Sequence, residues 1–105
     1  MPRYFLSKKA VDDLSYIWEY TYDTWSEKQA DRYYGLLIDA CRELTKSPRR
    51  GRSYNDVVPG IMGVASQSHV LFYQLTNNGD IVIVRILHKR MDVRTNIDDP
   101  SLRSG

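Results

Sequence analysis

Four polar side chains gather at the end of an apolar segment near the C-terminus. Histidine can exchange a proton near neutral pH and arginine can stabilise developing negative charge, so such a group could cleave a phosphodiester by acid–base chemistry. The same side chains could instead bind an anionic surface without any reaction. The four residues are Arg85, His88, Arg90 and Asp92.

His69 begins the preceding apolar segment, and the Asn78-Gly79 pair between the two segments is typical of a hairpin turn. Pairing outward from that turn would bring His69 close to His88. Each histidine is then either an acid–base partner or a structural residue held by hydrogen bonds. The segment Ile61–Ser66 of the same expected sheet carries no basic residue, which argues against a phosphate-cleaving site.

Arg85 stands among apolar neighbours, and a half-buried arginine needs an anionic or carbonyl partner. Asp92 is the candidate partner within the chain, and such a pair would lock the end of the sheet. The alternative is that Arg85 presents its charge to another macromolecule.

A second basic group, Arg49, Arg50 and Arg52, lies in a segment whose prolines and glycines indicate a loop. This segment is either a solvated loop or an anion-binding patch. Residues 1–47 contain seven Lys/Arg and eight Asp/Glu, whereas residues 48–105 contain eight and five. We therefore expect an acidic partner to bind the second half of the chain.

The composition excludes several classes of protein. With 105 residues, 42% of them hydrophobic and 27% charged, the chain has the size and composition of one globular domain. One cysteine, Cys41, and two histidines supply neither an internal disulfide nor a structural zinc site, and no cofactor-binding motif occurs, so we expect no cofactor. No signal-peptide pattern or membrane-spanning apolar run is present, so we expect a soluble cytoplasmic protein with no membrane partner.

Amphipathic spacing predicts two helices. Apolar residues recur at three- and four-residue steps over 8–24, with Ser7 as the expected N-cap. A capping-box pattern at Ser26 starts a second helix, which should end before Pro48. The short connection between them makes the pair an antiparallel hairpin.

Surplus apolar side chains on this hairpin indicate a partner surface. Tyr16 and Tyr20 fall roughly opposite the apolar stripe of the first helix. Leu36 and Ile38 on the second helix lie about 160° apart at 100° per residue, so one core cannot cover both. Either the second helix is buried on two sides or it exposes apolar surface to a partner.

Three later segments, 61–66, 69–75 and 81–88, are rich in β-branched and aromatic residues and predict strands. With a brief first strand at 4–6, the element order is β-α-α-β-β-β. We therefore predict one α+β domain, residues 1–92, whose antiparallel sheet packs against the N-terminal helix hairpin. A polar tail, residues 93–105, follows it.

A helix start at Ser7, followed by Ile17-Trp18 and Trp25, precedes the motif from Arg85 to Asp92, and this final motif is specific. With these residues the chain resembles the ParE toxins of the ParE/RelE superfamily over residues 4–92. The resemblance implies a RelE/ParE-like fold and a bacterial type II toxin–antitoxin system. It also implies a toxin that inhibits DNA gyrase, blocks replication and is neutralised by a ParD-like antitoxin, with no sequence-specific binding to nucleic acid expected.

The resemblance implies roles for the residues above. Because the antitoxin of such complexes wraps the helix hairpin and sheet, Tyr16, Tyr20, Leu36 and Ile38 are candidate antitoxin contacts. The candidate target-binding or structural residues are Arg85, His88, Arg90, Asp92, Arg49, Arg50 and Arg52, and no residue is expected to be catalytic. In the alternative, the RelE branch cuts mRNA on the ribosome, and His88 and Arg85 would act as acid–base and charge-stabilising groups.

Overall fold

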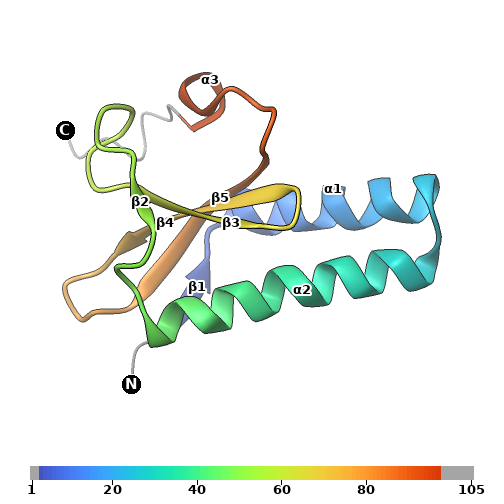
Figure 1. The fold of residues 1–105 in the computed structure, drawn as a ribbon, viewed down its shortest axis with the longest axis horizontal. Coiled ribbons are helices and arrows are strands. Elements are labelled where there is room, and N and C mark those ends of the chain that lie inside the picture. The colour runs from blue at the N-terminus through green and yellow to red at the C-terminus, as the bar shows by residue number, and fades with distance from the viewer. Residues whose placement is uncertain (1–2, 98–105) are drawn as a thin grey trace.

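Serine caps set where the two long helices begin in the computed structural model, which describes residues 3–97. Ser7 caps α1 (Lys8–Thr24) and Ser26 caps α2 (Glu27–Lys46), each accepting the backbone amide three residues further on. The two helices form the predicted antiparallel hairpin, and the end at which they are joined extends beyond the sheet (Figure 1). The sheet therefore does not cover the joined end of α1 and α2.

The sheet has five strands in the order β1-β5-β4-β3-β2. Strands β2 to β5 pair antiparallel, as predicted, whereas β1 pairs parallel with β5 and makes the sheet mixed. The strand β2 has only two residues and lies in the segment expected to be a loop. The bounds are β1 (Tyr4–Leu6), β2 (Arg52–Ser53), β3 (Met62–Ser66), β4 (His69–Leu75) and β5 (Ile81–His88).

The hairpin between β4 and β5 turns where the sequence predicts it, through a loop wider than two residues. Thr76 donates its amide to the carbonyl of Asp80 at 2.8 Å, and Gly79 has a φ of +83°, which a residue with a side chain rarely adopts. The strand register shifts by one residue between Phe72 and Tyr73, and this shift places His69 directly opposite His88.

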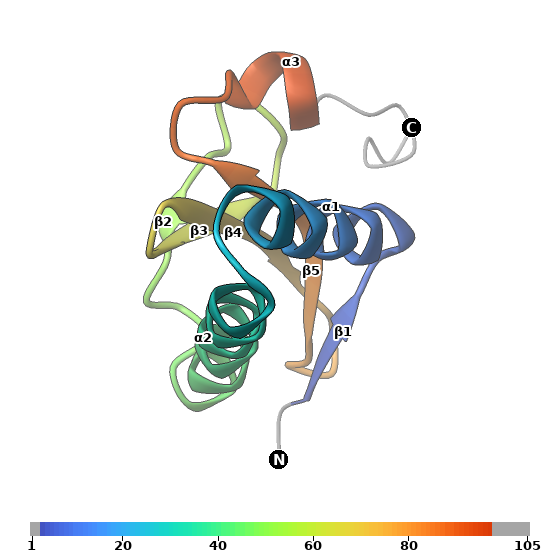
Figure 2. The ribbon, with the colours of Figure 1, turned by 90° about the vertical axis from the view of Figure 1, so that its right-hand side faces the viewer.

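Apolar cores cover both faces of the sheet, so β5 is buried on both sides, as its continuous apolar sequence predicts. One core joins the sheet to the helix hairpin and contains Cys41, whose pKa burial raises to about 11. The other lies under α3 (Val93–Ile97), on the far side of the sheet from α2 (Figure 2).

The helix α3 occupies the start of the segment expected to be a polar tail. Ile97 is fully buried in the second core, so the chain stays folded past Asp92. The rest of the expected tail, residues 98–105, lies outside the described residues.

Candidate functional site

The ion-pair partner of Arg85 is Asp13 of α1, which corrects the expected pairing with Asp92. The Asp13 carboxylate accepts hydrogen bonds from Nε and Nη2 of Arg85 at 2.8 and 3.0 Å, and from the amide of Ile86 at 2.9 Å. Arg85 also donates through Nη1 to the carbonyl of Asn96 at 2.6 Å. Both charged side chains are largely buried, with exposed fractions of 17% and 15%.

Asp92 instead caps α3. Its carboxylate accepts hydrogen bonds from the hydroxyl of Thr95 at 2.6 Å and the amide of Arg94 at 3.1 Å. These contacts, the Thr95 bond first, lower the pKa of Asp92. The end of the motif therefore starts a helix, because a side-chain oxygen at this position satisfies free amides of the first turn.

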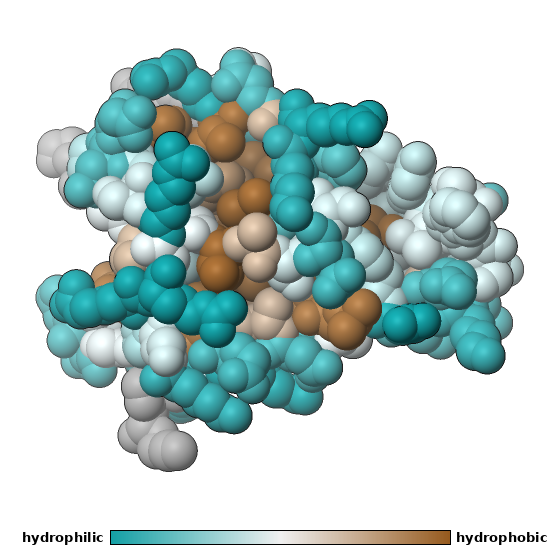
Figure 3. Space-filling view, in the orientation of Figure 1, coloured by the Kyte–Doolittle hydropathy of each residue, from teal (hydrophilic) through white to brown (hydrophobic). Residues whose placement is uncertain are grey.

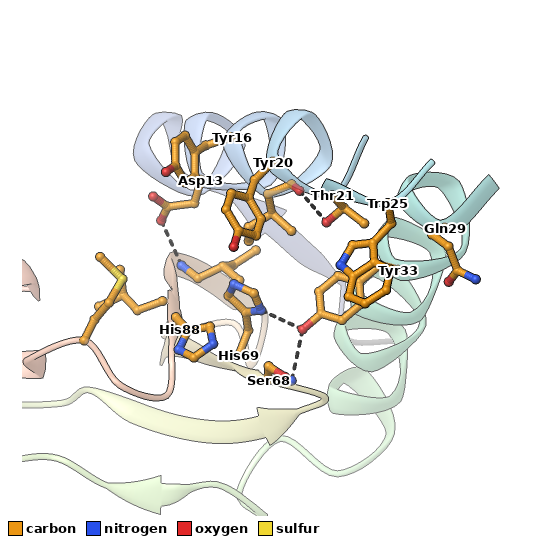
Figure 4. A pocket seen from close by; sticks show the side chains of 14 residues that line it. Asp13, Tyr16, Tyr20, Thr21, Trp25, Gln29, Tyr33, Ser68, His69 and His88 are labelled. Atoms are coloured by element: carbon orange, nitrogen blue, oxygen red, sulfur yellow. Dashed lines mark hydrogen bonds between the residues drawn. The ribbon is translucent and has the colours of Figure 1, made fainter. Parts of the chain in front are cut away.

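A groove of about 640 Å³ lies between the helix hairpin and the ends of β4 and β5 (Figure 4). Its walls are mostly aromatic and aliphatic, and Tyr16 and Tyr20 stack on each other along α1 with ring centres 6.4 Å apart. Both candidate tyrosines are exposed here, at 69% and 58%. The lining residues are Asp13, Tyr16, Ile17, Tyr20, Thr21, Trp25, Gln29, Tyr33, Ser68, His69, Ile86, Leu87, His88 and Met91.

The two histidines meet at the floor of this groove, as the hairpin register predicts. Their ring centres are 5.3 Å apart in an edge-to-face arrangement. Nδ1 of His69 is bonded at 2.7 Å to the hydroxyl of Tyr33, whose oxygen also accepts the amide of Ser68 at 3.0 Å. Tyr33 thus ties α2 to the turn between β3 and β4, a role that the helix pattern alone does not reveal.

His88 is fixed in one tautomer. Its Nδ1 accepts the backbone amide of Arg90 at 3.1 Å, and since an amide can only donate, the ring proton of neutral His88 lies on Nε2. The side chain of Arg90 itself lies on the surface. The backbone of the motif therefore holds the ring that lines the groove.

Burial, with the neighbouring His88 as the second cause, lowers the pKa of His69 to about 4. An unfolded chain would protonate His69 near its ordinary pKa of about 6.5, so it binds more protons than the folded protein below that pH. We expect the free energy of unfolding to fall as the pH drops from about 6.5 towards 4, and His69→Gln to flatten this slope. A titration of the His69 ring signals by NMR checks the cause, and a midpoint near 6.5 would contradict it.

Leu36 and Ile38 are both half-buried and lie on opposite flanks of α2. Ile38 packs against the core beneath the helices. Leu36 lies one turn after Tyr33, on the flank of α2 that faces the groove. The two residues therefore differ: Ile38 packs on the core, whereas Leu36 is half-buried outside it and does not line the groove. An exposed apolar band bordered by hydrophilic side chains is visible on the face in Figure 3.

The loop with Arg49, Arg50 and Arg52 lies at the other end of the sheet and is fastened by a buried tyrosine. The hydroxyl of Tyr73 donates to the carbonyl of Pro48 at 2.8 Å and accepts the amide of Gly51 at 3.0 Å. A side chain at Gly51 would collide with this hydroxyl. All three arginines have exposed side chains.

We expect Tyr73→Phe to lower the free energy of unfolding by about 1–3 kcal/mol, because the partly buried Gly51 amide and Pro48 carbonyl lose their partner. Chemical denaturation measures this change. Tyr54→Phe is the matched control, since no hydrogen bond to the Tyr54 hydroxyl is found within residues 3–97. Equal stabilities of the two variants would contradict a fastening role for the Tyr73 hydroxyl.

Comparison with known proteins gives consistent results. Residues 4–93 match the family model described as the ParE toxin of the type II toxin–antitoxin system parDE. The chain is 42% identical over 95 residues to Toxin ParE1 of Mycobacterium tuberculosis, covering 90% of this chain and 97% of that protein.

Two solved toxin–antitoxin systems have the same fold at 18% identity. The chromosomal ParDE system of P. aeruginosa matches with a TM-score of 0.73 over 84% of this chain and 96% of that chain. The RelBE2 complex of Mycobacterium tuberculosis matches with a TM-score of 0.65 over 85% and 100%. Within residues 3–97, no helix is long and apolar enough to cross a membrane.

Proposed function

Because the chain belongs to the ParE toxin family of type II toxin–antitoxin systems, we propose that it inhibits DNA gyrase, blocks replication and performs no catalysis of its own. The observation that carries this choice over mRNA cleavage is the position of Arg85. Its guanidinium is bound by the Asp13 carboxylate and the Asn96 carbonyl, so it is not available to a phosphate in a transition state.

The state of His69 supports the same choice. With its pKa lowered to about 4, His69 is neutral at physiological pH and a poor proton donor there. A ribonuclease that used the two histidines would have His88 alone as its acid–base group. It would also lack Arg85 as the group that stabilises charge. The proposed site of action is the cytoplasm, where gyrase works on DNA.

The proposed partner is a ParD-like antitoxin that covers the groove. Tyr16, Tyr20 and Trp25 expose large aromatic surfaces around it, and exposed apolar surface of this kind marks interaction sites. Tyrosine and tryptophan are also the residues that most often carry binding energy.

The experiment that tests the function adds purified protein to a gyrase supercoiling reaction and, in parallel, to translating ribosomes with a reporter mRNA. We expect loss of supercoiling with intact mRNA. Cleaved mRNA beside normal supercoiling would establish the RelE-like alternative. Inclusion of the antitoxin should restore supercoiling.

Leu36→Asp should weaken binding of the antitoxin by about 10-fold or more, because the interface would bury an unpaired carboxylate. Calorimetry of the toxin–antitoxin pair measures the affinity. Tyr34→Asp is the matched control, since Tyr34 is exposed on the flank of α2 away from Leu36. An unchanged affinity for Leu36→Asp would place the antitoxin elsewhere.

A further inference from the structure

We propose that Arg49, Arg50 and Arg52 form a phosphate-binding edge that holds the backbone of duplex DNA without reading its sequence. The inference rests on the proposed function in one respect, namely that the proposed target acts on DNA. The binding itself can be measured without that target.

The positive charge of this edge is not neutralised within the described part of the chain. Among residues 3–97, none of the three arginines is ion-paired with a carboxylate. Two acidic side chains near the loop are already paired, Asp80 with Arg3 and Glu43 with Lys46. Three unpaired guanidinium groups within four residues favour an anionic partner.

The backbone that carries these charges is held in place before any partner binds. Tyr73 bonds to the loop on both sides of Arg49 and Arg50, and Arg52 is paired with Gly63 in the sheet. The guanidinium of Arg52 lies over the ring of Tyr54, 5.4 Å from its centre. Binding of a partner therefore costs little entropy for ordering the loop backbone, and the guanidinium fork of arginine suits phosphate oxygens.

The edge and the groove lie at opposite ends of the molecule. The loop joins the C-terminal end of α2 to β2, whereas the groove lies towards the joined end of the hairpin (Figure 1). A protein in the groove can thus leave the arginines open. DNA is the partner that the edge fits, because phosphates repeat along its whole length and need no matched surface.

The test measures fluorescence anisotropy of two labelled duplexes of about 20 bp with unrelated sequences, at salt concentrations from about 50 to 200 mM. The variant Arg49→Gln/Arg50→Gln/Arg52→Gln is compared with the matched control Lys28→Gln/Arg32→Gln/Arg42→Gln, which removes the same charge from the exposed surface of α2. Thermal unfolding confirms that both variants fold.

We expect equal affinity of the parent protein for both duplexes. We also expect the slope of log affinity against log salt to fall by about 2.7 in the loop variant, at about 0.9 per phosphate contact, and by less than about 1 in the control. No salt-dependent binding by the parent, or equal slopes in the two variants, would overturn the proposal. So would loop-dependent binding to immobilised gyrase without DNA while duplex binding is unchanged, since the edge would then recognise an acidic protein surface.

Failure of the proposed function gives a different result. If the chain binds DNA through the loop but leaves supercoiling intact, the proposal of a phosphate-binding edge is supported and the proposal of gyrase inhibition is wrong.

Discussion

Asp13→Ala is expected to lower the free energy of unfolding by about 3–5 kcal/mol, the largest effect of any single substitution considered for this chain. The change removes both hydrogen bonds that Arg85 makes to the carboxylate and the one from the Ile86 amide. Because Arg85 is only 17% exposed, its charge would remain largely buried without the carboxylate that neutralises it.

Urea unfolding at neutral pH measures this change. Asp12→Ala is the matched control, because Asp12 is the same residue type one position earlier and lies exposed on α1. Its effect should stay within about 0.5 kcal/mol. If the two variants lost equal stability, the ion pair of Arg85 and Asp13 would not make the contribution to the free energy of unfolding that its geometry indicates.

The double substitution Tyr16→Asp/Tyr20→Asp is expected to weaken antitoxin binding by about 100-fold or more, provided that the antitoxin covers the groove as proposed. Two stacked rings would be replaced by carboxylates that an apolar interface cannot solvate. A loss of 100-fold corresponds to about 2.7 kcal/mol of binding free energy.

Surface-captured antitoxin and a concentration series of the toxin give the affinity. Tyr22→Asp is the control: Tyr22 is exposed on α1 but stacks on Trp18 and does not line the groove. Equal losses in the two variants would indicate a general effect of charge on α1. A folded double variant that still binds at parental affinity would exclude the groove as the antitoxin site.

The fold follows from patterns that act over short stretches of sequence. The serine caps, the helical spacing of apolar residues and the turn at Gly79 each depend on neighbours, and each is confirmed. The closeness of the two histidines also follows from the turn, but their direct pairing depends on a register shift of one residue between Phe72 and Tyr73, which the sequence pattern does not reveal. The predicted polar tail, 93–105, begins with the helix α3, whose five residues are stabilised by burial of Ile97 and by the cap at Asp92.

The site is less accessible to sequence reasoning because its main contacts join distant segments. Asp12 and Asp13 look alike in the sequence, and only the packing of α1 on the sheet brings one of them to Arg85, 72 positions away. Asp92 lies only seven positions from Arg85, so sequence distance favours it over Asp13. The available signal was the position of Asp13 on the flank of the apolar stripe that includes Leu14 and Ile17.

The Asp13 contact to Ile86 also bears on how the chain avoids self-association. β1 covers β5 only from Ile81 to Ile83, so the rest of this strand would be an open edge. The hydroxyl of Ser7 donates a hydrogen bond to the carbonyl of Val84, and the carboxylate of Asp13 accepts one from the amide of Ile86. Two backbone groups that could pair with another strand are thus bonded to side chains, which hinders edge-to-edge pairing at the middle of this apolar strand.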